Sequence, residues 1–157
     1  MLKAQDIMTT KVITVSPQTI ITQAARLLLD NHLNGLPVVD EKGRLIGIIS
    51  QNDLIFQQKK IPLPSFFTVF DSFLPLGSEK AIKKEVEKIA ATTVEEAMST
   101  DPISIVPDTS LEDIATLMVE NDIHTLPVIH AEDKRMVGII GKEDILRTLM
   151  LDENNNI

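Results

Sequence analysis

The sequence predicts an α+β fold in which two β-α-β-β-α repeats pack together with pseudo-two-fold symmetry, with a helical insert between them. Three observations predict it: the chain repeats itself, both copies alternate extended and helical patterns in the same order, and a Phe-rich segment interrupts the repeat. The chain has 157 residues, of which 43% are hydrophobic. A unit of roughly 50 residues rarely builds a sufficient core alone, so we expect the copies to pack on each other.

The repeat is visible when the chain is aligned with itself. A shift of 90 positions places Met8 on Met98, and one extra residue in a later turn raises the shift to 91, which places Asp53 on Asp144. Other matches keep this order: Pro17 with Pro107, Asn31 with Asn121, Leu36-Pro37-Val38 with Leu126-Pro127-Val128, and Gly47-Ile48-Ile49 with Gly138-Ile139-Ile140. The alignment divides the chain into repeat 1 (1–56), an insert (57–93), repeat 2 (94–150) and a polar tail (151–157).

Both copies predict the same elements in the same order, as the first copy illustrates. Residues 12–15 are β-branched and precede a proline, which favours a short strand. A single apolar stripe predicts a helix from Ile20, ended by a left-handed residue at Asn31. Two apolar runs around a short turn at 41–43 predict an antiparallel hairpin, and a second helix begins near Ser50. Because the hairpin is too apolar to face water, we expect helices to cover it.

Composition and missing motifs exclude several classes of function. Without cysteine the chain has no disulfide, thiolate metal site or cysteine nucleophile. A net charge of −8 disfavours nucleic acids and anionic membranes. Phosphate-binding loops and nucleophile motifs are absent from the sequence, and its histidines lack metal-ligand spacing. We therefore expect a cytoplasmic protein that is not an enzyme, holds no metal or catalytic cofactor and binds no nucleic acid; membrane contact is disfavoured.

The repeated motif resembles a known family. A hydrophobic-Pro-Val segment, a turn, Gly-Ile-Ile and an aspartate follow one another in each copy, which resembles the cystathionine beta-synthase (CBS) domain. Two tandem copies resemble a CBS pair, or Bateman module. The resemblance implies a regulatory module that binds an adenosine-containing ligand (AMP, ADP or ATP, with NAD or S-adenosylmethionine as alternatives) in clefts between the copies. It also implies a homodimer and a separate effector protein as partner.

Ser50 and Asp53 match the family's Ser/Thr-x-x-Asp motif at a helix start. The resemblance implies that Asp53 accepts hydrogen bonds from both ribose hydroxyls, because a carboxylate offers two acceptor oxygens to a vicinal diol. The same spacing is typical of a helix N-cap, and the two roles are compatible. His124 either pairs with a phosphate when protonated or is a surface or capping histidine. The implied main cleft combines Asn34, Gly35, Ser50, Asp53, Ile103, Ser104 and His124.

The resemblance implies a second, weaker cleft that combines Ile13, Thr14, Thr125 and Asp144. Gly141 stands there in place of the motif's serine and supplies no hydroxyl, so we expect unequal occupancy of the two clefts. Lys142 either supplies a cation to this cleft or is a solvated surface lysine. Few arginines lie near either motif, which favours a ligand with few phosphates or little net negative charge.

The insert at 57–93 carries phenylalanines at helical spacing, and a second helix is predicted at 78–90. Three interpretations of the Phe-rich face follow, in this order: packing on the chain's own core or a dimer mate, docking to a protein partner, and contact with a membrane surface. An alternative function follows from the first, namely a nucleotide-free dimerisation and assembly module whose clefts are filled by side chains.

Overall fold

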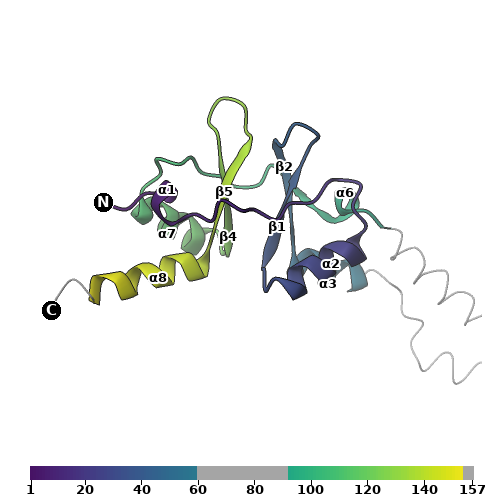
Figure 1. The fold of residues 1–157 in the computed structure, drawn as a ribbon. Helices are drawn as coiled ribbons and strands as arrows, with labels where there is room; N and C mark the ends of the chain where they lie inside the picture. The colour runs from purple at the N-terminus through teal and green to yellow at the C-terminus, as the bar shows by residue number, and fades with distance from the viewer. Residues whose placement is uncertain (60–91, 154–157) are drawn as a thin grey trace, which may run out of the picture.

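The computed structural model describes residues 1–59 and 92–153 of the chain (Figure 1). The predicted helices of the insert and the end of the polar tail lie outside these residues. The elements in chain order are α1 (Ala4–Ile7), α2 (Ile21–Asp30), β1 (Gly35–Val39), β2 (Leu45–Ser50), α3 (Gln51–Lys59), α6 (Val94–Ala97), β3 (Ser99–Thr100), α7 (Leu111–Glu120), β4 (Thr125–Ile129), β5 (Met136–Gly141) and α8 (Lys142–Glu153). The predicted mixture of helices and strands is confirmed.

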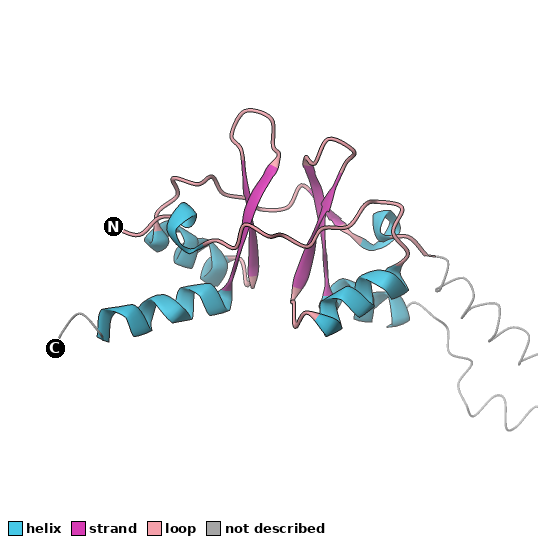
Figure 2. Cartoon of the chain, viewed as in Figure 1, coloured by secondary structure: helices cyan, strands magenta, loops and turns pink. Residues whose placement is uncertain are grey.

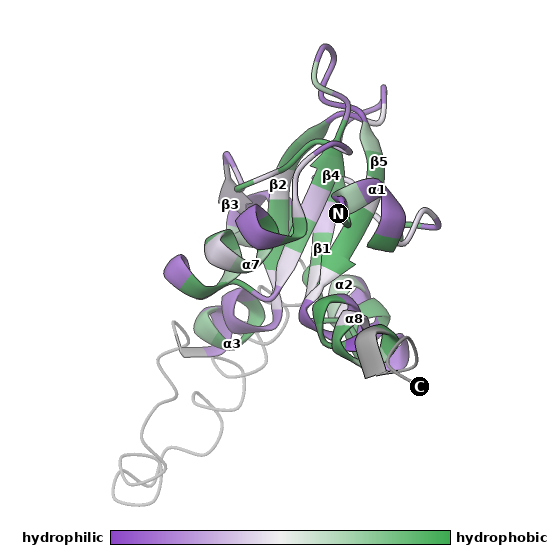
Figure 3. Ribbon diagram, turned by 90° about the vertical axis from the view of Figure 1, so that its left-hand side faces the viewer, coloured by the Kyte–Doolittle hydropathy of each residue, from purple (hydrophilic) through white to green (hydrophobic). Residues whose placement is uncertain are grey.

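Two antiparallel hairpins stand at the centre of the molecule, with helices on their outer flanks (Figure 2). In the first hairpin Gly35 pairs with Ser50, and in the second Thr125 pairs with Gly141. Both hairpins carry a register shift at the same place, after Val38 and after Val128. The strands are hydrophobic and the turns at their tips are hydrophilic (Figure 3). Leu36, Val38, Leu126 and Val128 are fully buried, so the apolar strands are covered as expected.

The predicted strand at residues 12–15 is reduced to a single bridge. Val15 pairs in parallel with Val38, and Ile105 does the same with Val128 in the other repeat. The Val15 amide donates to the Pro37 carbonyl at 3.0 Å, and the Val39 amide donates to the Val15 carbonyl at 3.0 Å. Only Val15 of the predicted short extended segment therefore joins the ladder.

The left-handed residue after each first helix is one position later than expected. Asn31 has φ −105°, whereas His32 has φ 53°; in the second repeat Asn121 has φ −104° and Asp122 has φ 49°. The Asn31 amide side chain instead donates to the Leu27 carbonyl at 2.9 Å. The asparagine therefore satisfies a free carbonyl at the helix end, and the next residue reverses the chain.

Each repeat receives its first segment from the other repeat, which the sequence pattern did not indicate. The Thr9 amide donates to the Ile139 carbonyl at 2.9 Å and the Ile139 amide donates back at the same distance. Equivalently, β3 pairs with β2 of the first repeat. Helix α1 consequently lies beside α7 in Figure 1, on the side of the second repeat, and α6 lies with the first.

The hydrogen bonds that hold the two exchanged segments are related by the 90-residue shift. The Ala4 amide donates to the Thr109 carbonyl at 2.8 Å, and the equivalent Val94 amide donates to the Thr19 carbonyl at 2.7 Å. Ala4 and Val94 are fully buried, each within the core of the repeat it joins. The two cores are therefore built from both halves of the chain. The buried members of the first are Val15, Ala24, Leu28, Leu36, Val38, Ile49 and Val94, and those of the second are Ala4, Ile105, Ile114, Met118, Leu126, Val128 and Ile140.

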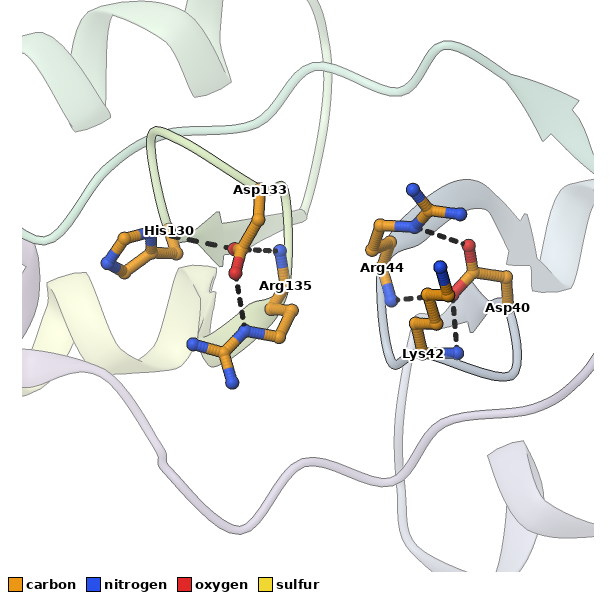
Figure 4. A network of polar contacts seen from close by, with 6 residues as sticks. All are labelled: Asp40, Lys42, Arg44, His130, Asp133 and Arg135. Carbon is orange, nitrogen blue, oxygen red and sulfur yellow. Dashed lines mark hydrogen bonds and ion pairs between the residues drawn. The ribbon is translucent and has the colours of Figure 1, made fainter.

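The hairpin turns of the two repeats are also joined. The Leu45 amide donates to the Lys134 carbonyl at 3.0 Å, and the Met136 amide donates to the Gly43 carbonyl at 3.1 Å. Each turn is held by an aspartate (Figure 4). Asp40 accepts from the Arg44 amide at 2.9 Å and from Arg44 Nε at 2.7 Å.

Asp133 has the same role in the second turn, with the Arg135 amide at 3.1 Å and Arg135 Nε at 2.7 Å (Figure 4). The Arg44 amide hydrogen bond is the main cause that lowers the pKa of Asp40, and the Arg135 amide does the same for the pKa of Asp133. Hydrogen bonds to a carboxylate favour its charged form.

Candidate functional site

Two clefts are lined by residues of both repeats, one on each side of the pseudo-two-fold axis. We call them the Asp53 cleft and the Asp144 cleft after the aspartate at the start of α3 and of α8 that lines each of them. Their volumes are about 390 Å³ and about 270 Å³. Asn34, Gly35, Thr125 and Lys142 line both clefts, so the two cavities adjoin where β1 and β4 begin.

Asp53 forms the predicted helix cap and still lines its cleft. Its Oδ2 accepts from the Ser50 amide at 2.8 Å and from the Ser50 hydroxyl at 3.0 Å, while the Ser50 oxygen accepts from the Asp53 amide at 3.2 Å. All of these carboxylate bonds use Oδ2, and Oδ1 has no hydrogen bond from any of the residues that the structure describes. The cap therefore fixes the carboxyl group and leaves one acceptor oxygen for a ligand in the cleft.

Asp144 is held in a different way. The Gly141 amide donates to its Oδ2 at 2.8 Å, as the Ser50 amide does for Asp53, but Gly141 brings no hydroxyl. The second oxygen, Oδ1, accepts from Arg147 Nη1 at 3.2 Å. Arg147 also lies 3.9 Å from Glu143. The second carboxylate oxygen of Asp144 is therefore already hydrogen-bonded to an arginine one turn further along α8.

The structure brings together five of the seven residues expected in the main cleft. Asn34, Gly35, Ser50, Asp53 and His124 line the Asp53 cleft. The other two, Ile103 and Ser104, do not line it. Ile103 is half-exposed, and Ser104 lies in a separate depression beside the hairpin turns, with Arg44 and Asp133.

Three of the four residues expected in the second cleft lie there: Ile13, Thr125 and Asp144. Thr14 is not part of its lining. The expected linings are thus corrected at Ile103, Ser104 and Thr14. The physical reason at Ile103 and Ser104 is a turn of the chain: Ser99 lines the Asp53 cleft, and the chain then turns at Asp101, with φ 51°, toward the hairpin turns.

Several polar residues of the clefts were missed in the sequence. Lys11, His32 and Arg147 line the Asp144 cleft, and Asp122 and Gln51 line the Asp53 cleft. The internal alignment could have pointed to Gln51, because Gln51 is equivalent to Lys142 of the other repeat. Lys142, expected as a possible cation for the Asp144 cleft, lines that cleft and its neighbour.

The described residues also bear on metal binding and on membrane insertion. Within residues 1–59 and 92–153, no group of three or more histidine, aspartate or glutamate side chains is placed to hold a metal ion. Among the same residues, every helix is too short or too polar to cross a bilayer.

A family model for the CBS domain matches the chain twice, at residues 4–60 and 94–151. The chain belongs to the CBS-domain family. Its two repeats form a CBS pair, as the repeated motif indicated. The chloroplastic CBS domain-containing protein CBSX1 of Arabidopsis thaliana is 28% identical over 144 residues, which cover 87% of this chain. The matched region spans only 58% of the length of CBSX1.

Two solved CBS pairs have the same fold and were crystallised with adenosine compounds. The crystal structure of CBSX2 in complex with AMP is 27% identical with a TM-score of 0.73, and the match covers 96% of this chain and 98% of that one. CBSX2 is a protein of Arabidopsis thaliana. The CBS pair of MJ0100, solved with 5′-methylthioadenosine and S-adenosyl-L-methionine, is 27% identical with a TM-score of 0.68 and the same coverage.

Proposed function

We propose that this CBS pair is a regulatory, non-catalytic module that binds adenosine nucleotides of the AMP, ADP and ATP class between its repeats. Ligand-dependent repacking of the repeats then signals metabolite state to a separate effector protein. The observation that carries the proposal is Asp53, whose carboxyl group is fixed by its own helix cap while Oδ1 remains available beside a cleft lined from both repeats. The solved relatives that hold AMP, methylthioadenosine and S-adenosylmethionine support this ligand class.

The signalling step follows from how the clefts are built. Each cleft has walls from both repeats, so a bound ligand contacts both at once. A ligand can shift the packing of the repeats only by its differential affinity for the two arrangements. The exchanged first segments and the joined hairpin turns are the contacts through which such a shift passes from one repeat to the other.

The test is calorimetric titration of the full chain with AMP, ADP, ATP, NAD and S-adenosylmethionine. Asp53→Asn keeps an acceptor for the helix cap but removes the charge that grips the ribose diol. We expect it to lower the affinity of the Asp53 cleft for adenosine compounds about tenfold or more, the scale of a charge-assisted hydrogen bond. Asp113→Asn, at the equivalent helix position of α7 and outside both clefts, is the matched control. Unchanged affinity in Asp53→Asn would contradict the proposed site.

We also propose that the module is a homodimer. Apolar side chains are exposed at equivalent positions of both helix pairs: Leu29 and Val119 are 70% and 81% exposed, and Ile55 and Leu146 are 66% and 58% exposed. A second copy would cover these faces, since large exposed apolar patches mark interaction sites. The same observation favours the second candidate function, a nucleotide-free assembly module. A thermal melt separates the two, because only a nucleotide sensor is stabilised by millimolar nucleotide.

A further inference from the structure

We propose that the two clefts are specialised by charge. The Asp144 cleft takes an adenosine ligand that carries phosphate, and the Asp53 cleft takes an adenosine compound without net negative charge. The inference rests on the proposed function and adds that its two sites bind different adenosine compounds. It also assigns Lys11 and Lys142 as the groups that recognise phosphate.

The two clefts differ in the charges that line them. Three basic side chains (Lys11, Lys142 and Arg147) and two acidic ones (Glu143 and Asp144) line the Asp144 cleft. Two aspartates (Asp53 and Asp122) and the shared Lys142 line the Asp53 cleft. Basic groups therefore outnumber acidic groups in one cleft, and the reverse holds in the other.

The difference follows the internal alignment position by position. Lys11, His32, Lys142 and Arg147 of the Asp144 cleft are equivalent to Asp101, Asp122, Gln51 and Phe56 of the other half of the chain. A basic or ionisable nitrogen group is replaced by an acidic, neutral or aromatic one at all four positions. Glu143, which is equivalent to Asn52, is one exchange in the opposite direction. Two of these counterparts, Gln51 and Asp122, line the Asp53 cleft, so these exchanges change the charge of the lining directly.

The lysines are the groups available to a ligand. Arg147 is engaged by Asp144 at 3.2 Å and lies 3.9 Å from Glu143. The ammonium groups of Lys11 and Lys142 have no ion pair with any residue in the part of the chain that the structure describes. Gln51, the counterpart of Lys142, instead donates from its side chain to the Leu33 carbonyl at 2.8 Å. The Asp144 cleft thus offers two ammonium groups, each with three donors for phosphate oxygens.

The chemistry then assigns the ligands. A phosphate monoester carries a charge of about −1.5 to −2 at pH 7. In the Asp53 cleft such a group would meet the carboxylates of Asp53 and Asp122, and like charges repel. An uncharged adenosine, or a cationic adenosine compound, has no such cost there. From the sequence we expected the Asp144 cleft to bind more weakly, because Gly141 lacks a hydroxyl. For an anionic ligand, Lys11 and Lys142 reverse that order of affinity.

The test is calorimetric titration of the full chain with AMP and with adenosine, which differ only in the phosphate. Lys11 lines only the Asp144 cleft, so we expect Lys11→Gln to lower AMP affinity about three- to tenfold and to leave adenosine affinity unchanged. Lys42→Gln makes the same change of charge at a hairpin turn outside both clefts and is the matched control. In the wild-type chain, added salt should weaken AMP binding more than adenosine binding.

A reciprocal variant tests the other cleft. Asp122 has φ 49°, a backbone conformation that asparagine tolerates, so Asp122→Asn removes a carboxylate without straining the turn. We expect one tight AMP site per wild-type chain and a strengthened second site in Asp122→Asn. Equal AMP affinity at both wild-type sites, or a Lys11→Gln effect as large for adenosine as for AMP, would overturn the charge assignment alone. Absence of binding by both AMP and adenosine would instead refute the proposed function and, with it, this inference.

Discussion

The sulfur of Met98 lies against the backbone of Gly47, a residue of the other repeat. A Cβ atom at Gly47 would stand 2.6 Å from that sulfur and 2.9 Å from the Ser99 carbonyl oxygen. The same relationship joins Met8 to Gly138, where a Cβ would stand 2.5 Å from the sulfur. The repeated glycine of the Gly-Ile-Ile motif is thus the place where each exchanged segment crosses the sheet of its host repeat.

Gly47→Ala should destabilise the chain because the carbonyl of Ser99 cannot move aside as a flexible side chain can. We expect a loss of about 1–3 kcal/mol in the free energy of unfolding, the usual range for overpacking. Urea denaturation measures it. Gly35→Ala is the control, since a Cβ there meets its neighbours at 3.5 Å, an ordinary contact. Equal stability of the two variants would show that the β3 crossing is not a tight contact.

The hairpin turns should respond to acid. The folded-state pKa values of Asp40 and Asp133 are lowered, chiefly by the amides of Arg44 and Arg135. Their contribution to stability is therefore fully present above the ordinary aspartate pKa of 3.8 and is lost as the pH falls through the lower folded-state values. We expect a double Asp40→Asn, Asp133→Asn variant to show a smaller fall in urea midpoint than the wild type on acidification from about pH 5 to about pH 3. A control change of Asp101 to Asn should keep the wild-type slope.

The N-terminal segment should loosen at high pH. Lys3 forms an ion pair with Asp108 of the second repeat, and this hydrogen bond and charge raise the pKa of Lys3. A raised folded-state value means that the contribution is fully present below the ordinary lysine pKa of 10.5 and is lost as the pH rises through the folded-state pKa. Lys3→Gln should speed hydrogen exchange at the Ala4 amide, which is bonded to Thr109, relative to Val94. Identical protection of the Ala4 amide in wild type and variant would show that the Lys3–Asp108 ion pair does not hold the N-terminal segment.

Two serines separate the capping role from the ligand role. Ser50 accepts from the Asp53 amide at 3.2 Å, and Ser110 accepts from the Asp113 amide at 3.1 Å. Each change to alanine should cost about 1 kcal/mol of stability, as loss of an N-cap does. Only Ser50→Ala should also weaken adenosine binding in the Asp53 cleft, because its hydroxyl holds Asp53 beside the cleft. Equal adenosine affinity in both variants would limit Ser50 to its role as a helix cap.

The proposed dimer is tested on α8. Leu146 of the proposed dimer face is 58% exposed on this helix, and Leu146→Glu should convert the dimer to a monomer in light scattering after gel filtration. Lys134→Glu, at a hairpin tip, is the control and should remain dimeric. A wild-type chain that is monomeric at all concentrations would refute the proposal.

The repeat, the hairpins and the helix starts were readable because each depends on a local pattern: apolar runs, a short turn, and a serine or glycine three residues before an aspartate. The exchange of first segments was not readable. The alignment shows that Met8 and Met98 are equivalent, but the same residues would repeat whichever sheet each segment joined. Ser104 was assigned to the Asp53 cleft from the family resemblance, and no local pattern showed that the chain turns at Asp101 and takes Ser104 to the hairpin turns.

The exchanged segments have a consequence for how the chain can be divided. A half-chain ending at residue 59 would keep α1 but lose the second-repeat surface that α1 covers, and it would leave Gly47 without its methionine. The half beginning at residue 92 would keep α6 but lose the first-repeat core that α6 joins, and it would leave Gly138 without Met8. Neither half could therefore be fused to another protein as an independent domain. The two halves have complementary pairing edges, so we expect them to reassemble when they are produced together.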